Sequence, residues 1–349
     1  MNIRKTSAKA AAILVLATAV LLSFSMARPV EKTGKSIAVF VPGIVSGSPV
    51  YEMLVSGAQK AVDEYKGRDF GPLSLTVIEA GTNQSEWPGK ITALCAEGKY
   101  DLILSSNPAL PDIIEPLTKQ FPKQYFIILD SYKEGNASMA TVQYNQRQQA
   151  YMAGFAAAMA STSTDLKFAN TDKKIALIAA QEYPVMNQVL YPSFVEGAKA
   201  YDKDIAVEFR LVGNWYDASK GNELARSLYK DGVDVILPIA GGASQGVIAA
   251  AKDLGFYISW FDSDGYSKAP GYVISSAMIM QEKMTKKILS DYIENKVVFG
   301  KAFTAGMEDG YVGFTPYEPL TDSAIRTEKL DALITSITEK VLVLDPPVM

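Results

Sequence analysis

Three carboxylates stand at or just beyond the ends of apolar runs that are typical of buried strands: Asp130, Asp262 and Asp264. Two such groups facing each other could act as general acid and base, as in glycoside hydrolysis. Nothing in their spacing places two of them across one bond. The sequence contains no histidine, which excludes Ser-His-Asp and Cys-His catalysis and histidine-ligated zinc. We therefore expect no catalytic residues and no metal site, with a carboxylate enzyme as the weaker alternative.

A second candidate is the glycine pair Gly241-Gly242, in the stretch ILPIAGGASQGVIAAAKDLG that begins at Ile236. An apolar strand leads into these glycines and a helical pattern follows, which exposes backbone N–H groups at a helix N-terminus. The stretch matches neither GxGxxG nor GxxxxGK[ST]. Alone, it does not distinguish a phosphate site from a turn that serves another purpose.

The elements that must position these residues occur twice along the chain. Nearly continuous apolar runs predict strands at residues 37–41, 73–79, 102–105 and 125–129, with helical spacing at 51–65, 86–97 and 111–121. The rhythm restarts with strands at 175–179, 207–212, 235–238 and 258–261 and helices at 189–201, 219–230 and 244–254. The segment EGKYDLILS at Glu97 resembles KDGVDVILP at Lys230. Such alternation predicts α/β architecture with parallel sheets covered on both faces, in two similar lobes.

A further strand at 272–276, a helix at 281–295 and a closing segment with DGYVGF at Asp309 follow the second half. A tail of this kind suits a cleft protein whose chain crosses between lobes several times. We place the crossings near Tyr144, Asp264 and Lys296. The expected first lobe is residues 36–143 plus 266–296, and the expected second lobe is residues 144–265 plus 297–349.

The N-terminus predicts export. Three cations precede an apolar run at residues 10–24, and small residues up to Ala27 allow cleavage there, so residues 1–27 have the parts of a signal peptide. An uncleaved anchor is the alternative, and no lipobox cysteine follows the run. Either way the location is periplasmic or extracytoplasmic. The formal net charge of −4 disfavours nucleic acid as a partner, and the single cysteine, Cys95, is expected to be a buried free thiol.

Side chains just beyond the carboxyl ends of parallel strands meet at one edge of a sheet, where ligands bind. In this chain those loops are rich in aromatic and amide groups and nearly free of cations, which favours an uncharged planar ligand. Loop Asn and Ser residues commonly cap helices, Trp87 could staple a turn, Trp260 is expected in the core and Asp264 in a turn. The expected ligand-binding residues are Ser48, Tyr51, Asn83, Gln84, Trp87, Ser106, Asn107, Tyr144, Asn145, Gln146, Met186, Trp215, Gly241, Gly242 and Asp262.

Four stretches carry a family resemblance: YDLILSSNPALPDIIEPLTKQFPKQYFIILD at Tyr100, YNQRQQAYMAGFAAAMAS at Tyr144, GNWYDASKGNELARSLYKDGVDVILPIAGGASQGVIAAAKDLG at Gly213 and FDSD at Phe261. They resemble the basic membrane protein family, the purine-nucleoside-receptor-like substrate-binding proteins of ABC importers. The resemblance implies the type I periplasmic-binding-protein fold, with two Rossmann-like lobes joined by three hinge strands. It also implies that the glycine pair brings backbone close to a ligand and is not a phosphate cradle.

Nucleoside-binding members of that family carry DKSFN after the first strand, whose aromatic residue stacks on the base, and an Asp and a Lys that hold the ribose. Here the loop reads PGIVSGSPVYEM, so Tyr51 is the aromatic counterpart and the DK pair is missing. The Asp corresponds to Asp262, and SSAMIM in place of TSMVKR puts Ile279 where the lysine belongs. IEAGTNQSEW at Ile78, SSNPALP at Ser105 and YNQRQQAY at Tyr144 resemble instead the riboflavin-uptake (Rfu-type) branch.

The resemblance therefore implies a substrate-binding protein of an ABC importer that closes on riboflavin and delivers it to a permease and ATPase in the inner membrane. Riboflavin would be the transported ligand, with no cofactor, and the protein a monomer. The alternatives are a purine-nucleoside binder of the same family and a ligand-sensing receptor subunit. A carboxylate enzyme is the least favoured.

Overall fold

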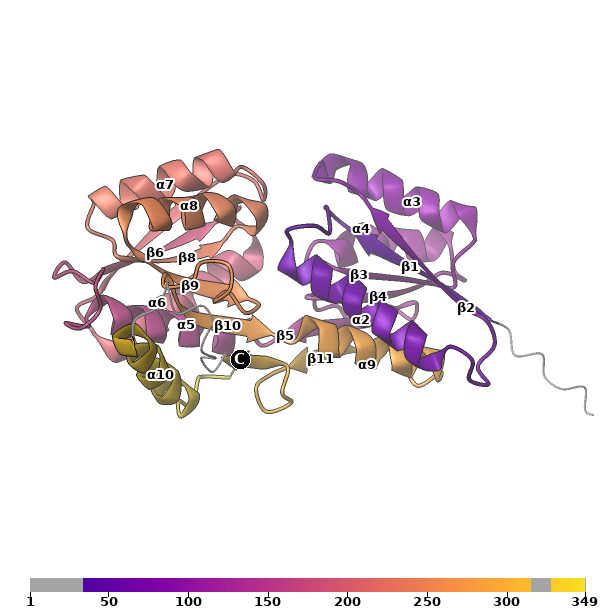
Figure 1. Ribbon diagram of the computed structural model, residues 1–349. Helices are drawn as coiled ribbons and strands as arrows, with labels where there is room; N and C mark the ends of the chain where they lie inside the picture. Colours follow the sequence, from indigo (N-terminus) through magenta and orange to yellow (C-terminus); the bar gives the residue numbers. More distant parts are fainter. Residues whose placement is uncertain (1–33, 315–327, 349) are drawn as a thin grey trace, which may run out of the picture.

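Two lobes, each built on a six-stranded sheet, lie side by side in the computed structural model, which describes residues 34–314 and 328–348 (Figure 1). The predicted signal peptide at residues 1–27 lies outside these residues. The strand orders are β2-β1-β3-β4-β5-β11 in the first sheet and β7-β6-β8-β9-β10-β12 in the second. The order is the same in both, so the predicted two-lobed α/β fold with structurally similar halves is confirmed.

The first lobe contains strands β1 (Lys35–Val41), β2 (Leu73–Glu79), β3 (Leu102–Ser106), β4 (Tyr125–Leu129), β5 (Met139–Tyr144) and β11 (Ala302–Ala305). Its helices are α2 (Pro49–Tyr65), α3 (Trp87–Glu97), α4 (Leu110–Gln120) and α9 (Gln281–Ile293), with a short 3-10 turn η1 (Gln84–Glu86) before α3. All the strand pairs of this sheet are parallel.

The second lobe contains strands β6 (Lys174–Ala179), β7 (Ala206–Leu211), β8 (Val235–Ile239), β9 (Tyr257–Asp262), β10 (Val273–Ile279) and β12 (Val312–Phe314). Its helices are α5 (Gln146–Ser161), α6 (Tyr191–Tyr201), α7 (Ala218–Lys230), α8 (Ser244–Leu254) and α10 (Glu328–Leu342), with a π-helical turn η2 (Met186–Leu190) and a 3-10 turn η3 (Gly241–Ala243). Only β12 runs antiparallel to its neighbour, β10, in the pairs described.

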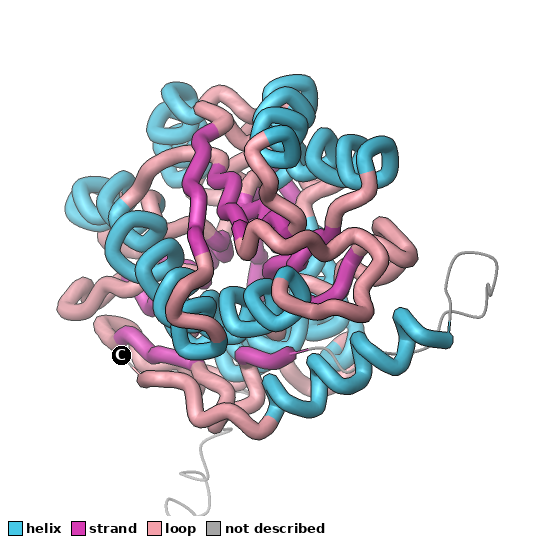
Figure 2. Tube along the Cα trace, turned by 90° about the vertical axis from the view of Figure 1, so that its left-hand side faces the viewer, coloured by secondary structure: helices cyan, strands magenta, loops and turns pink. Residues whose placement is uncertain are grey.

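Each central strand sends alternate side chains to opposite faces of its sheet, as strand geometry requires. In β1, Ile37 and Val39 belong to the core cluster that includes α2, whereas Phe40 packs with residues of α3 and α4 on the other face. In β6, Leu177 and Ile178 divide in the same way between the α5–α6 layer and the α7–α8 layer. Figure 2 shows the resulting layers, with strands enclosed by helices on both sides. This double coverage is why the strands are nearly continuous apolar runs.

The hydrogen-bonded pairs change two of the predicted crossing points. The first crossing lies where it is predicted, between Tyr144 of β5 and α5. The predicted boundary at residue 266 is wrong, because β10 pairs with β9 in the second sheet. The second crossing therefore lies later in the chain, between β10 and α9. The boundary at residue 297 is also wrong, because β11 pairs with β5 in the first sheet and the third crossing follows it.

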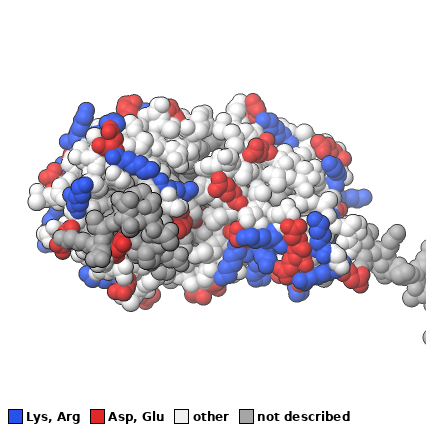
Figure 3. All heavy atoms as spheres, viewed as in Figure 1, with Lys and Arg blue, Asp and Glu red and all other residues white. Residues whose placement is uncertain are grey.

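Charged side chains tie α9 to the first lobe after the second crossing. Lys60 and Glu64 of α2 form ion pairs with Glu282 and Lys286 of α9. Figure 3 shows the Lys, Arg, Asp and Glu side chains gathered over α2 and α9. These pairs are exposed, so each contributes little to stability. The packing of α9 on the first lobe depends instead on its buried face, which includes Leu289, Tyr292 and Ile293.

Helix α5 is the main element that periodicity does not predict. Thirteen of its sixteen residues are buried, so it shows no polar stripe at helical spacing. Neither α5 nor any other helix in the described ranges is long and apolar enough to cross a membrane. Cys95 is buried on α3 as predicted, and burial raises the pKa of its thiol to about 11.

Glycines let α5 and α6 cross with their backbones in contact. A Cβ atom built on Gly154 would lie 2.0 Å from the carbonyl oxygen of Phe194, and one on Gly197 would lie 2.0 Å from that of Tyr151. Backbone atoms cannot move aside as a flexible side chain can. The crossing therefore requires both glycines.

Replacing Gly154 by alanine should force the two helices apart and lower the free energy of unfolding by about 1–3 kcal/mol. Gly89 of α3 is the matched control, because a Cβ atom there meets no atom within 4 Å. Gly89→Ala should leave stability unchanged or raise it by about 0.5–1 kcal/mol. Urea denaturation of both variants measures this difference, and a fully stable Gly154→Ala protein would contradict the close crossing.

Candidate functional site

A cavity of about 460 Å³ lies between the lobes, at the carboxyl ends of strands from both sheets. In the first lobe the loops after β1, β2, β3 and β4 contribute to its lining, and in the second lobe the loops after β6, β7 and β8 and the end of β9 do so. Strands whose carboxyl ends face each other from two sheets bring these seven loops and one strand end to one place. The fold thus creates the cleft that the sequence predicts.

Most of the predicted site residues come together in this lining. They are Ser48, Tyr51, Gln84, Trp87, Ser106, Asn107, Gln146, Trp215, Gly241, Gly242 and Asp262. Ser48 is the N-cap residue of α2, but its hydroxyl makes no capping hydrogen bond. Four predicted residues, Asn83, Tyr144, Asn145 and Met186, do not line the cavity.

Tyr51 presents its ring to the cavity from the first turn of α2. Its hydroxyl donates to the carbonyl oxygen of Pro42 at 3.1 Å and interacts with the Asn107 side chain. Burial raises the pKa of Tyr51 to about 12, with the hydrogen bond from Asn107 opposing the shift. Because the protein already uses this hydroxyl, the ring face is what Tyr51 offers to a ligand.

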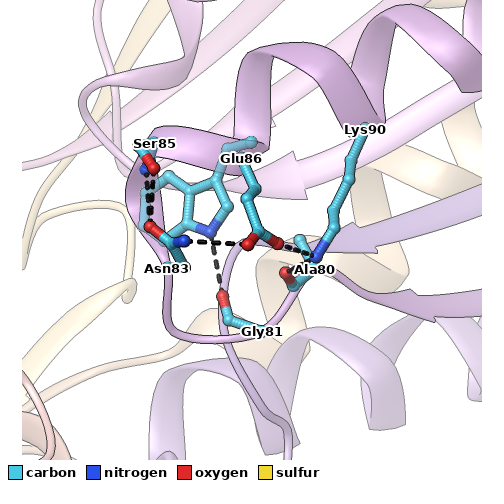
Figure 4. Close-up of polar contacts among 7 residues, drawn as sticks. Ala80, Gly81, Asn83, Ser85, Glu86 and Lys90 are labelled. Carbon is cyan, nitrogen blue, oxygen red and sulfur yellow. Dashed lines mark hydrogen bonds and ion pairs between the residues drawn. The ribbon is translucent and has the colours of Figure 1, made fainter.

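Trp87 both closes a turn and lines the cavity. Its indole N–H donates to the carbonyl oxygen of Gly81 at 2.9 Å, which fixes the ring at the start of α3. In the same turn the side-chain oxygen of Asn83 accepts from the backbone N–H and hydroxyl of Ser85, and its side-chain amide donates to Glu86 at 2.8 Å (Figure 4). Asn83 lies outside the cavity lining, where its amide organises the turn that holds Trp87, and its ligand role stays a prediction.

Three side chains from different loops connect the lobes across the cavity. The side-chain oxygen Oε1 of Gln181, after β6, accepts from the indole N–H of Trp215 at 3.0 Å and from the side-chain amide of Gln84 in the first lobe at 3.1 Å. The ring of Tyr183 lies 6.0 Å from that of Trp215. We call Gln84, Gln181 and Trp215 the bridging triad, because Gln181 joins a cavity wall of one lobe to a loop of the other.

The glycine pair packs against the same tryptophan. Gly241 has a left-handed backbone with φ of +54°, and a Cβ atom on it would lie 3.0 Å from the carbonyl oxygen of Trp215. At Gly242 the corresponding distance is 3.4 Å. The glycines therefore allow the turn before α8 to approach Trp215 while their backbone lines the cavity.

The polar residues around the first crossing hold the hinge. The Tyr144 hydroxyl donates to the side-chain oxygen Oε1 of Gln281 at 2.8 Å, and the side-chain amide of Gln281 donates to the Ser106 hydroxyl at 2.7 Å. Asn145 caps α5 by accepting from the backbone N–H of Gln148. Met186 is fully buried in the core of the second lobe. Tyr144, Asn145 and Met186 therefore lie outside the cavity lining, and their ligand contacts stay predictions.

Two carboxylates occupy equivalent strand ends, one in each lobe. Asp130 directly follows β4 and Asp262 ends β9, and both line the cavity with left-handed backbones, φ +54° and +68°. Burial and the nearby charge of Asp262 raise the pKa of Asp130 to about 8. Burial also raises the pKa of Asp262 to about 6, opposed by a hydrogen bond from Gln149.

Asp130, Gln181 and Tyr183 line the cavity but are not among the predicted binding residues. The internal repeat could have indicated Asp130, because it occupies the position of Asp262 in the other half. Trp260 is buried as predicted, yet it also reaches the lining. No lysine or arginine is among the lining residues in the described chain, and no group of three or more Cys, Asp or Glu there could hold a metal ion. The arrangement suits recognition of an uncharged ring with hydroxyl groups.

Known proteins share the sequence pattern and the fold of this chain. Basic membrane protein D of Borreliella burgdorferi is 28% identical over 293 residues, covering 82% of each chain. The ABC transporter nucleoside-binding protein BmpA of Lactococcus lactis is 31% identical over 155 residues, covering 44% of this chain and 41% of its own. A solute-binding protein of an ABC transporter system from Aeropyrum pernix has the same fold, with a TM-score of 0.73 at 18% identity over 88% and 86% of the two chains. Residues 34–344 match the family described as ABC transporter substrate-binding protein PnrA-like, and the chain belongs to this family.

Proposed function

We propose that this substrate-binding protein captures riboflavin between its lobes and presents it to the permease of an ABC importer. Its family is that of ABC transporter substrate-binding proteins, which supports an extracytoplasmic location, a small-molecule ligand, a permease as partner and a role without catalysis. Riboflavin would be the transported ligand and not a resident cofactor. The identity of the ligand is the part that we infer.

The observation that carries the proposal is a cavity lined by aromatic rings but by no described lysine or arginine. Tyr51 and Trp87 line it from the first lobe, and Tyr183 and Trp215 from the second. A wide planar ring gains contact area from such faces, and the lining amides can pair with its polar edge. Asp262 can accept hydrogen bonds from ribityl hydroxyls. A phosphorylated ligand would instead need Lys or Arg.

Closure of the lobes follows from the same contacts. A ligand held by one lobe favours the closed form when it also contacts the other lobe. The bridging triad already joins the two walls through Gln181, so little further rearrangement is needed at that edge. Two of the three crossings lie where α5 and α9 begin, and Gln146 of α5 lines the cavity beside the first of them.

A purine nucleoside is the second candidate, because the Lactococcus lactis relative is described as nucleoside-binding. The chain departs from the nucleoside-binding pattern at Ile279, which is buried at the end of β10 where a ribose-binding lysine would stand. The cavity lining therefore supplies a carboxylate that can accept hydrogen bonds from ligand hydroxyls, but not the lysine that accompanies it in nucleoside-binding proteins.

Mass spectrometry of small molecules released by denaturing the purified protein tests the ligand directly. We expect riboflavin, and a yellow protein whose flavin emission is quenched. All three tryptophans of the chain line the cavity, so added riboflavin should also quench tryptophan emission. Recovery of adenosine or guanosine would reject riboflavin while leaving the family assignment intact.

Two substitutions at Trp215 separate its ring from its N–H group. Trp215→Ala removes both and should raise the Kd for riboflavin about 10–100-fold, as expected when a stacking aromatic is lost. Trp215→Phe keeps a ring but cannot donate to Gln181, so its effect should stay below about fivefold. Fluorescence titration measures both.

The matched control is Tyr132→Ala, because this aromatic residue is 53% exposed in the loop after β4 and does not line the cavity. Its Kd should equal that of the unmodified protein. Equal losses in the Phe and Ala variants of Trp215 would contradict stacking and assign the effect to the hydrogen bond with Gln181.

A further inference from the structure

The cavity between the lobes is lined by two carboxyl groups at equivalent positions, Asp130 and Asp262, and both accept hydrogen bonds from helix α5. In the first two turns of α5, the amide of Gln146 donates to Oδ1 of Asp130 at 3.1 Å and the amide of Gln149 donates to Oδ1 of Asp262 at 3.1 Å. Gln149 also donates to the carbonyl oxygen of Ala277 at 3.0 Å. The hinge helix thus holds one oxygen of the carboxyl group of each lobe.

The groups that face this pair carry no positive charge. Tyr51 from α2, Tyr144 from β5 and Tyr183 from the loop after β6 interact with Asp130, and burial raises the pKa of each. Each of these phenols is therefore neutral near pH 7. The other carboxylate of the lining is Glu182, which is exposed at its rim, and no described lining residue is Lys or Arg.

Burial without a neighbouring cation disfavours the charge on Asp130, and the charge of Asp262 adds to this effect, so both favour the protonated form of Asp130. The supporting amides are not equivalent. Gln149 is fixed by its second hydrogen bond to Ala277, so it holds a negative charge on Asp262 in a set position. This favours Asp262 as the ionised member, and it agrees with the higher pKa of Asp130.

We propose that the two groups bind ligand in different protonation states: Asp130 as a neutral carboxylic acid that donates a hydrogen bond, and Asp262 as a carboxylate that accepts from hydroxyls. The inference rests on the proposed function and extends it. The site then selects an uncharged ligand that offers an acceptor atom to the first lobe and a hydroxyl group to the second. Asp130 becomes a specificity-determining residue, and binding requires its proton.

The direction of the pH dependence follows. An unfolded Asp ionises near pH 4, whereas folded Asp130 keeps its proton to about pH 8. Between these values the folded state binds the extra proton, so stability is present at low pH and falls as pH rises towards 8. Affinity for a ligand that accepts a hydrogen bond from protonated Asp130 should likewise fall as pH rises through about 8.

The experiment compares Asp130→Asn and Asp262→Asn with the unmodified protein, using riboflavin as the probe at about pH 7 and about pH 9. The wild-type Kd should rise about tenfold between these pH values. Asp130→Asn should bind at both with an affinity close to wild type at pH 7, because an amide can still donate. Asp262→Asn should bind more weakly at both. Asn tolerates the left-handed backbone at either position, so both variants are expected to fold.

Asp264→Asn is the matched control, since this exposed carboxylate is two residues from Asp262 and outside the cavity lining. It should follow the wild type at both pH values. A wild-type affinity that does not change with pH, or an Asp130→Asn variant as weak as Asp262→Asn, would overturn the proposal.

A second measurement needs no ligand and separates the two proposals. The melting temperature of the free protein should fall by about 2–4 °C between about pH 7 and about pH 9, and this fall should disappear in Asp130→Asn. The buried Asp234, whose pKa burial raises to about 6, titrates below this window. If riboflavin fails to bind but this difference persists, riboflavin is the wrong ligand and the neutral Asp130 stands. An identical fall in both proteins would overturn the neutral Asp130.

Discussion

The cavity between the lobes contains carboxyl groups that have no neighbouring cation, and this lack of positive charge limits which ligands it can bind. In the described lining, Asp130 and Asp262 are accompanied by amides, hydroxyls and aromatic rings, but by no lysine or arginine. Burying charge in such a place is costly unless the group is protonated or hydrogen-bonded. The glutamine amides at the start of α5 supply those hydrogen bonds, and the same turn marks the first crossing between the lobes. Ligand recognition and hinge geometry therefore depend on one short segment.

Much of the architecture could be predicted because it follows from local periodicity. Strands covered on both faces are continuous apolar runs, and β2, β4 and α8 begin and end at the predicted residues. Helix α5 lacks this signal because it is buried on nearly every side. The second and third crossings are wrong for a different reason: β10 and β11 have the composition of strands, but nothing local shows which sheet each of them joins.

The sequence predicts where in the fold the site lies better than it predicts which side chains line it. Parallel strands place their following loops at one edge, so most of the proposed residues meet in the cavity. Asn83, Tyr144 and Asn145 are polar residues in such loops or at the end of the preceding strand, and their hydrogen bonds serve a turn, the hinge and a helix cap. Sequence cannot distinguish these uses, because each depends on partners distant in the chain. The internal repeat does indicate that Asp130 and Asp262 occupy equivalent positions, because each follows the fourth predicted strand of its half.

The central claim is that the cavity accepts an uncharged ring system because its acidic groups have no cation beside them. Calorimetric titration of riboflavin against its phosphate ester tests this claim most directly, since the two ligands differ only by the charged group. The account predicts that the ester binds at least about 100-fold more weakly, as like charges brought together cost several kcal/mol. Equal or tighter binding of the ester would contradict it.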